Sequence, residues 1–133
     1  MTSQGSIKQI FGPVVDVAFE GDLPGINDAV EIPRKGEPPL VLEVAQHLGD
    51  DLVRCVAMAT TDGLRRGLPA EATGAPITVP VGDATMGRIF NLLGHPIDEK
   101  IKGKLEVEER WPIHRPAPAF DEQKAVSEVF ETG

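Results

Sequence analysis

The chain has 133 residues, a net charge of −8 and an apolar share of 41%, which suits one small domain and part of a second. The acidic balance extends over the whole chain, since residues 1–80 carry 6 basic and 11 acidic side chains and residues 81–133 carry 7 and 10. This balance, together with an aromatic content of only 5%, excludes a basic, aromatic-rich surface for nucleic acid, so we expect no nucleic-acid partner.

Residues 1–58 are expected to form short strands separated by turns. Val15, Val17 and Phe19 alternate with smaller or polar residues, which is the period of a half-buried strand. The clearest hairpin has Gly49-Asp50-Asp51 as its connection. The expected strands are Gly5–Phe11, Pro13–Phe19, Ala29–Pro33, Leu40–Leu48 and Leu52–Met58.

The chain after this hairpin adds a loop and one more strand. Thr60–Gly67 is predicted to be a loop that turns at Asp62-Gly63, and Gly67–Gly74 is expected to be irregular. Ile77–Val81 is then the sixth strand. Six short strands leave unpaired edges unless the sheet closes on itself. We therefore predict a mainly β fold with a small, closed, six-stranded barrel.

Gly74–Asp98 is expected to connect this barrel to a second unit. Gly82, Gly87 and Gly94 punctuate it, a spacing typical of a chain that turns or passes close to another backbone. Within it, the apolar segment Gly87–Leu93 suits a strand or a short helical turn, and we favour a strand.

The remaining residues are weakly patterned. Glu99–Arg110 is dominated by charge and is expected to be solvated, with Lys100, Lys102 and Lys104 on a mixed-charge surface. Trp111–Pro118 contains three prolines in eight residues and must be extended. A helical turn is expected within Asp121–Glu131. We expect residues 88–133 to be largely mobile when the chain is isolated.

Cellular context follows from what the sequence lacks. No apolar run approaches the roughly 20 residues of a membrane-spanning helix. MTSQGSIKQ at the N-terminus has no secretory signal. Cys55 cannot form an internal disulfide, and its alternating neighbours predict a small buried residue rather than a nucleophile. A soluble protein on the cytosolic side is expected.

The His, Cys, Asp, Glu, Arg and Ser residues of the sequence do not combine into a catalytic, cofactor-binding or metal-binding site. The histidines are far apart and no Cys-x-x-Cys pair exists to complete a zinc site. The adjacent carboxylates of Asp50-Asp51 and Glu108-Glu109 are better explained by a turn and a solvated face than by acid–base catalysis. Arg65 and Arg66 beside Asp62 form either an anion clamp or, as we favour, a polar turn. The other groups considered are His47, His95, His114, Asp50-Asp51, Glu108-Glu109, Ser3, Ser6 and Ser127.

Two further motifs are absent from the sequence. None of the serines lies in a G-x-S-x-G elbow. The phosphate-loop pattern is also missing, because Gly103-Lys104 is followed by Leu105 rather than by Ser or Thr.

Seven strings along the chain are GSIKQIFGPVVDVAF, EVAQHLGDDLVRCVAM, TTDGLRRG, GAPITVPVG, GRIFNLLGHPIDE, WPIHRPAPAF and FETG. Together they resemble the N-terminal part of the β subunit of F-type ATP synthases, in the same order and over essentially all 133 residues. The α subunit of these enzymes shares the barrel, but WPIHRPAP and the QHLG…VR…TTDGL run resemble β. His95 departs from the acidic or other polar residue that the family often has there.

The resemblance implies that residues 1–78 form a ring-forming barrel and that residues 79–133 are the incomplete start of an α/β nucleotide-binding domain. In the family the phosphate loop follows soon after FETG, and this chain stops before it. We therefore expect no catalytic, cofactor or metal site here, and ATP or ADP with Mg only in the full-length subunit. The fragment itself would serve ring assembly.

The resemblance also implies partners and a location. The partners would be the α subunits of the α3β3 ring and other synthase subunits, on the cytoplasmic side of an energy-transducing membrane without direct insertion. The full-length subunit would catalyse ATP synthesis and hydrolysis coupled to ion flow. Two alternatives are a stand-alone small-barrel binding module and the barrel of another ring ATPase.

Overall fold

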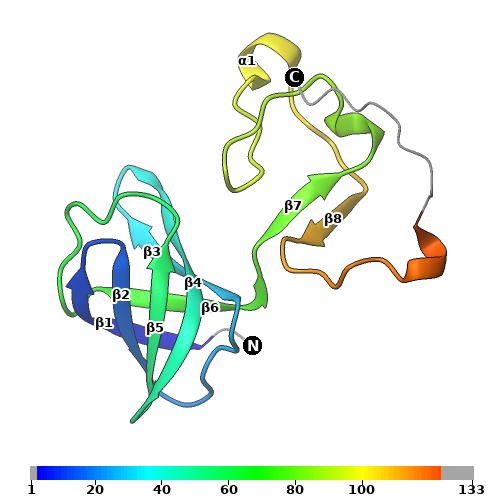
Figure 1. Cartoon of the computed structure of the whole chain (residues 1–133). Helices are drawn as coiled ribbons and strands as arrows, with labels where there is room; N and C mark the ends of the chain where they lie inside the picture. The colour runs from blue at the N-terminus through cyan, green and yellow to red at the C-terminus, as the bar shows by residue number, and fades with distance from the viewer. Residues whose placement is uncertain (1–2, 124–133) are drawn as a thin grey trace.

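The computed structural model describes residues 3–123 and contains two β-sheets joined by a short connection (Figure 1). The first sheet contains β1 (Gln4–Phe11), β2 (Val14–Phe19), β3 (Asp28–Arg34), β4 (Glu37–Gly49), β5 (Leu52–Ala57) and β6 (Pro69–Pro76). The second contains β7 (Thr78–Val81) and β8 (Glu109–Pro112). The helical segments are η1 (Asp83–Thr85), α1 (Glu99–Lys102) and η2 (Phe120–Glu122).

The first sheet is a closed barrel with the strand order β1-β2-β5-β4-β3-β6, in which every neighbouring pair is antiparallel. Closure is made by β6, which pairs with β1 on one side and with β3 on the other. Closure removes the free edges that six short strands would otherwise expose. The predicted mainly β fold with a six-stranded barrel is confirmed.

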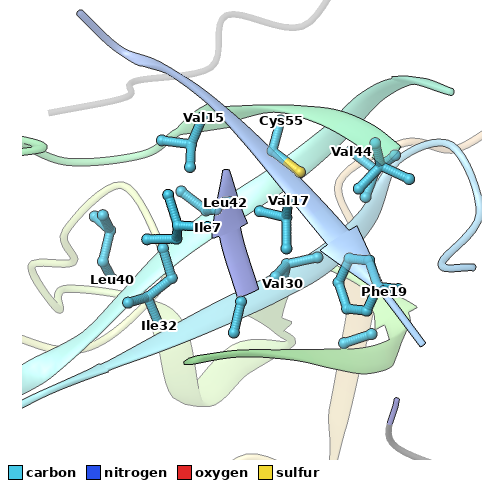
Figure 2. Packing of buried hydrophobic residues seen from close by; sticks show 13 residues of the cluster. Ile7, Val15, Val17, Phe19, Val30, Ile32, Leu40, Leu42, Val44 and Cys55 are labelled. Atoms are coloured by element: carbon cyan, nitrogen blue, oxygen red, sulfur yellow. The ribbon is translucent and has the colours of Figure 1, made fainter. Parts of the chain in front are cut away.

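The barrel interior is filled by apolar side chains from all six strands (Figure 2). The predicted inward face of β2 is confirmed, because Val15, Val17 and Phe19 are all buried. Burying a side chain of this size stabilises the fold by about 1.5–3 kcal/mol. The cluster consists of Ile7, Val15, Val17, Phe19, Val30, Ile32, Leu40, Leu42, Val44, Val53, Cys55, Ala70 and Ala72.

The predicted hairpin is also present, as β4 and β5. Gly49 pairs with Leu52, so the connection is the two residues Asp50 and Asp51, whose φ angles are 52° and 60°. Two positive φ angles in a two-residue loop are the geometry of a type I′ turn, whose twist matches that of the flanking strands. Aspartate tolerates this conformation better than most residues, which explains the acidic pair.

The prediction that Ile77–Val81 is the sixth barrel strand is wrong. The barrel is closed by β6, in the segment predicted to be irregular, whereas Thr78–Val81 pairs with β8 outside the barrel. The inward-facing residues of β6 that belong to the core are Ala70 and Ala72. Alanine gives little hydrophobic or strand-forming signal, so local sequence alone does not distinguish β6 from a loop.

The prediction of a strand over Gly87–Leu93 is wrong as well. Only an isolated bridge between Phe90 and Pro96 forms there. The side chain of Asn91 organises a loop instead, since its Oδ1 accepts hydrogen bonds from the N–H groups of Leu93 and His95 at 3.0 and 2.9 Å. An Asn side chain can thus replace a strand partner with a local turn.

The glycines of the connecting stretch behave as predicted. Gly82, Gly87 and Gly94 all have positive φ angles, of 102°, 70° and 73°. A Cβ at Gly94 would lie 2.7 Å from Cδ of Pro80, so the loop packs tightly against β7 at this point. The domain boundary at residue 78 stays a prediction.

The charged segment beyond the loop contains α1, and all four residues of this helix are exposed, as expected for a solvated segment. The predicted helical turn within Asp121–Glu131 lies partly outside the described residues. The structure has η2 at its start, and residues 124–133, with Ser127 and the FETG string, are not described.

Candidate assembly surface

The histidines considered in the sequence occupy three different environments. His47 on β4 donates from Nε2 to the carbonyl of Pro24 at 2.7 Å. His114 places Nε2 3.0 Å from Oε2 of Glu43 on β4, which links the segment after β8 to the barrel. His95 is exposed in the loop that Asn91 organises. Within residues 3–123, no three His, Cys, Asp or Glu side chains converge as a metal site would require.

The other residues considered in the sequence lie in turns, in local hydrogen bonds or on the surface. Asp50 and Asp51 form the exposed hairpin turn, and Glu109 accepts a hydrogen bond from the indole of Trp111. Lys102 donates to the carbonyl of Gly87. Two candidate serines are half-buried, Ser3 and Ser6. The charged candidates that remain are exposed, namely Glu108, Lys100 and Lys104.

Cys55 lies on β5 in the barrel core. Burial raises the pKa of its thiol to about 12, and the nearby Asp16 carboxylate acts in the same direction. The thiol therefore stays protonated at neutral pH, and only a thiolate is a good nucleophile. The prediction of a small buried residue is confirmed.

An ion pair between Arg88 and Asp98 stabilises the loop after β7. Arg88 Nε lies 3.1 Å from both carboxylate oxygens, and the N–H of Ile89 donates to the same carboxylate at 3.0 Å. Burial by itself would raise the pKa of Asp98, but the hydrogen bonds from Ile89 and Arg88 outweigh it and lower the pKa. The pair is a loop anchor that the sequence did not reveal, since the two residues belong to no recognisable motif.

A second ion pair lies on the outer face of the barrel. Arg54 on β5 and Asp16 on β2 are directly opposite each other, and the guanidinium binds the carboxylate with two hydrogen bonds of 3.0 and 3.1 Å. This side-chain hydrogen bonding raises the pKa of Arg54. Asp16 is only 4% exposed, although it points away from the core. Its charge is compensated by the bidentate contact with Arg54.

An apolar row runs beside this ion pair. Phe11, Val14 and Val56 are direct neighbours across β1, β2 and β5, so their side chains share the outer face. Phe11 is 40% exposed and Val56 is 39% exposed. The Arg54 guanidinium lies 5.3 Å from the centroid of the Phe11 ring, within the range of a cation–π contact. We call the set Phe11, Val14, Val56, Arg54 and Asp16 the outer patch.

The outer patch has the composition of a contact surface rather than of a catalytic site. It combines exposed apolar and aromatic area with an arginine held in a fixed position, and aromatic and arginine side chains are enriched in protein interfaces. It has no nucleophile or free general base. The sequence showed the strands but not the patch, because its members are up to 45 residues apart.

No helix within residues 3–123 is long and apolar enough to cross a bilayer.

A comparison with protein-family models finds one that matches residues 7–74, described as the β-barrel domain of the ATP synthase alpha/beta family. The match covers 68 of the 133 residues and begins and ends within β1 and β6, so it coincides with the closed barrel. The chain therefore belongs to the ATP synthase alpha/beta family, through its β-barrel domain.

Proposed function

We propose that this chain is the N-terminal region of a β subunit of an F-type ATP synthase, and that its barrel assembles with α-subunit barrels into the α3β3 ring. The observation that carries the proposal is the closed barrel, which coincides with the family match. Support for β rather than α comes from the WPIHRPAP string and the QHLG…VR…TTDGL run.

The outer patch supports an assembly role. Most strand edges are paired within the closed barrel, so its neighbours in a ring are recognised mainly through side chains on its outer face. Phe11 and Val56 supply the exposed apolar area, and Arg54 supplies an ordered cation that can contact an acidic group across an interface. The rest of the proposal concerns the full-length subunit. There ATP or ADP with Mg would bind in the domain that begins at residue 79, and catalysis would be coupled to ion flow at an energy-transducing membrane.

The proposal is tested by mixing the 133-residue chain with purified α subunit and measuring complex formation by size-exclusion chromatography with light scattering. The variant Phe11→Ser/Val56→Ser removes the two exposed large apolar side chains of the outer patch and leaves Val14. Ile26→Ser/Ile101→Ser is a matched control, because both isoleucines are exposed but lie elsewhere. We expect a stable complex with the parent chain and the control, and about tenfold weaker binding with the patch variant, equivalent to about 1.4 kcal/mol.

Two results would contradict the proposal. One is the absence of any complex with α although circular dichroism shows a folded barrel. The other is ATP hydrolysis by the purified chain, since the proposal assigns it no catalytic site. A barrel from another ring ATPase would instead bind that enzyme's subunit in the same assay, and a stand-alone module would bind neither.

A further inference from the structure

A cleft of about 500 Å³ lies between β1 and the loop that joins β5 to β6. Its β1 side consists of Lys8, Gln9 and Ile10, and its loop side consists of Leu64, Arg65 and Arg66. The cleft is separate from the outer patch. The patch extends from β1 over β2 and β5, whereas the cleft lies between β1 and the loop that joins β5 to β6.

The cleft exists because β1 loses its partner strand halfway along its length. Only Gln4–Ser6 pair with β6. At Ile7 the partner is already the loop, since Ile7 N–H donates to Leu68 O at 3.0 Å and Gly67 N–H donates to Ile7 O at 2.8 Å. From Gln9 to Phe11, β1 pairs with β2, whereas Lys8 lies at an irregularity in the register and has no partner in β2. Within residues 3–123 no second strand pairs with Lys8–Phe11 on the side of the cleft. This part of β1 therefore borders the cleft and not a neighbouring strand.

The charge of the cleft is opposite to that of the chain. Lys8, Arg65 and Arg66 are all exposed, and in the part of the chain that the structure describes none of them forms an ion pair. A chain with a net charge of −8 thus gathers three uncompensated cations around one cleft, and such a local positive potential attracts acidic groups.

Two apolar side chains also line the cleft. Ile10 and Leu64 are partly buried and pack against the barrel core. Cations together with partly buried apolar side chains suit a chain that carries acidic residues and an apolar residue together. A phosphate ion alone would leave the two apolar side chains uncontacted.

We propose that this cleft binds an extended, acidic segment of a partner protein. The segment runs along β1 from Lys8 toward Phe11, its carboxylates contact Lys8, Arg65 and Arg66, and one of its apolar side chains packs on Ile10 and Leu64. The inference goes beyond ring assembly, because it concerns a different surface and holds whether or not α subunits bind the outer patch.

The test uses the whole 133-residue chain labelled with ¹⁵N and a synthetic peptide in which Glu alternates with Leu. We expect amide shifts in two-dimensional NMR spectra to concentrate at residues 8–10 and 64–67. Arg65→Glu/Arg66→Glu should weaken binding by about tenfold or more, because two attractive contacts become repulsive. The matched control Lys100→Glu/Lys104→Glu makes the same charge change at residues that do not line the cleft and should alter affinity by less than about twofold. A peptide with Gln in place of Glu should bind weakly.

The proposal is overturned if the two double variants weaken binding equally, or if the amide shifts lie outside the cleft. Displacement of the peptide by millimolar inorganic phosphate would identify a small-anion site instead. Tighter binding of single-stranded DNA than of the peptide would identify a nucleic-acid site. Each of these readouts is independent of the α-subunit assay, so failure of one proposal is distinguishable from failure of the other.

Discussion

Replacing Gly5 by Ala tests whether the barrel depends on close contact between its first two strands. Gly5 lies opposite Phe19 in the β1–β2 register. A Cβ at this position would lie 2.4 Å from the carbonyl oxygen of Ala18 and 2.9 Å from Cδ1 of the Phe19 ring. The backbone of Gly5 is not in the left-handed region, so the expected effect is steric rather than conformational.

The magnitude follows from what must move. The closest atom belongs to the backbone of β2, which pairs with β1 and with β5, and Phe19 is fully buried in the core. Neither can yield without separating strands or disturbing the core. Overpacking of a rigid site costs about 1–3 kcal/mol, and we expect the upper end here, about 3 kcal/mol. A small domain has a total stability of about 5–15 kcal/mol, so this loss is easily measured.

Gly12→Ala is the matched control for this experiment. Gly12 has a φ of +56°, but a Cβ there would meet nothing within 4 Å. The control therefore adds the same methyl group with backbone strain alone, for which we expect about 1–2 kcal/mol. The assay is urea unfolding of the 133-residue chain, followed by far-UV circular dichroism and by hydrogen exchange of the core amides of β2 and β5. Trp111 lies outside the barrel on β8, so its fluorescence is not a suitable probe.

The steric argument would be refuted if Gly5→Ala changed the free energy of unfolding by less than about 0.5 kcal/mol, the range of an ordinary surface substitution. It would also be refuted if Gly12→Ala destabilised the chain more than Gly5→Ala does. In either case the distance between β1 and β2 would not be the constraint that excludes a side chain at position 5.

Three further predictions concern the barrel core. Leu42→Ala should lower the free energy of unfolding by about 2–5 kcal/mol, because it leaves a cavity among buried side chains. The control Leu92→Ala, at a 76% exposed position, should lower it by less than about 0.5 kcal/mol, and urea unfolding of both variants checks this. Cys55 should resist alkylation by iodoacetamide at pH 8 in the folded chain and react after unfolding, as mass spectrometry would show, and rapid labelling of the folded chain would contradict a buried thiol. Folding raises the pKa of Cys55 to about 12, so the buried thiol stabilises the folded chain most fully below the unfolded pKa near 9.0. This stabilisation should be lost as the pH rises toward 12, and unfolding measurements at pH 8 and pH 11 check it.

The sequence by itself determined the strands whose inward residues are large. In β2 and β4 the alternation of large inward Val, Leu and Phe residues with mostly smaller or polar ones is a local signal, because a two-residue period directly reflects which face meets the core. The hairpin turn at Asp50-Asp51 and the turning glycines were predictable for the same reason, since the conformations they adopt are properties of those residues themselves.

Only the tertiary structure determined how the barrel closes and what its surface carries. β6 contributes Ala70 and Ala72 to the core, and their small side chains become useful only once neighbouring strands surround them. The Asp16–Arg54 pair joins residues 38 positions apart, and the cleft beside Lys8 arises where a loop replaces a strand. Such features depend on which strands become neighbours, and the periodicity of a single strand contains no information about the identity of its partner.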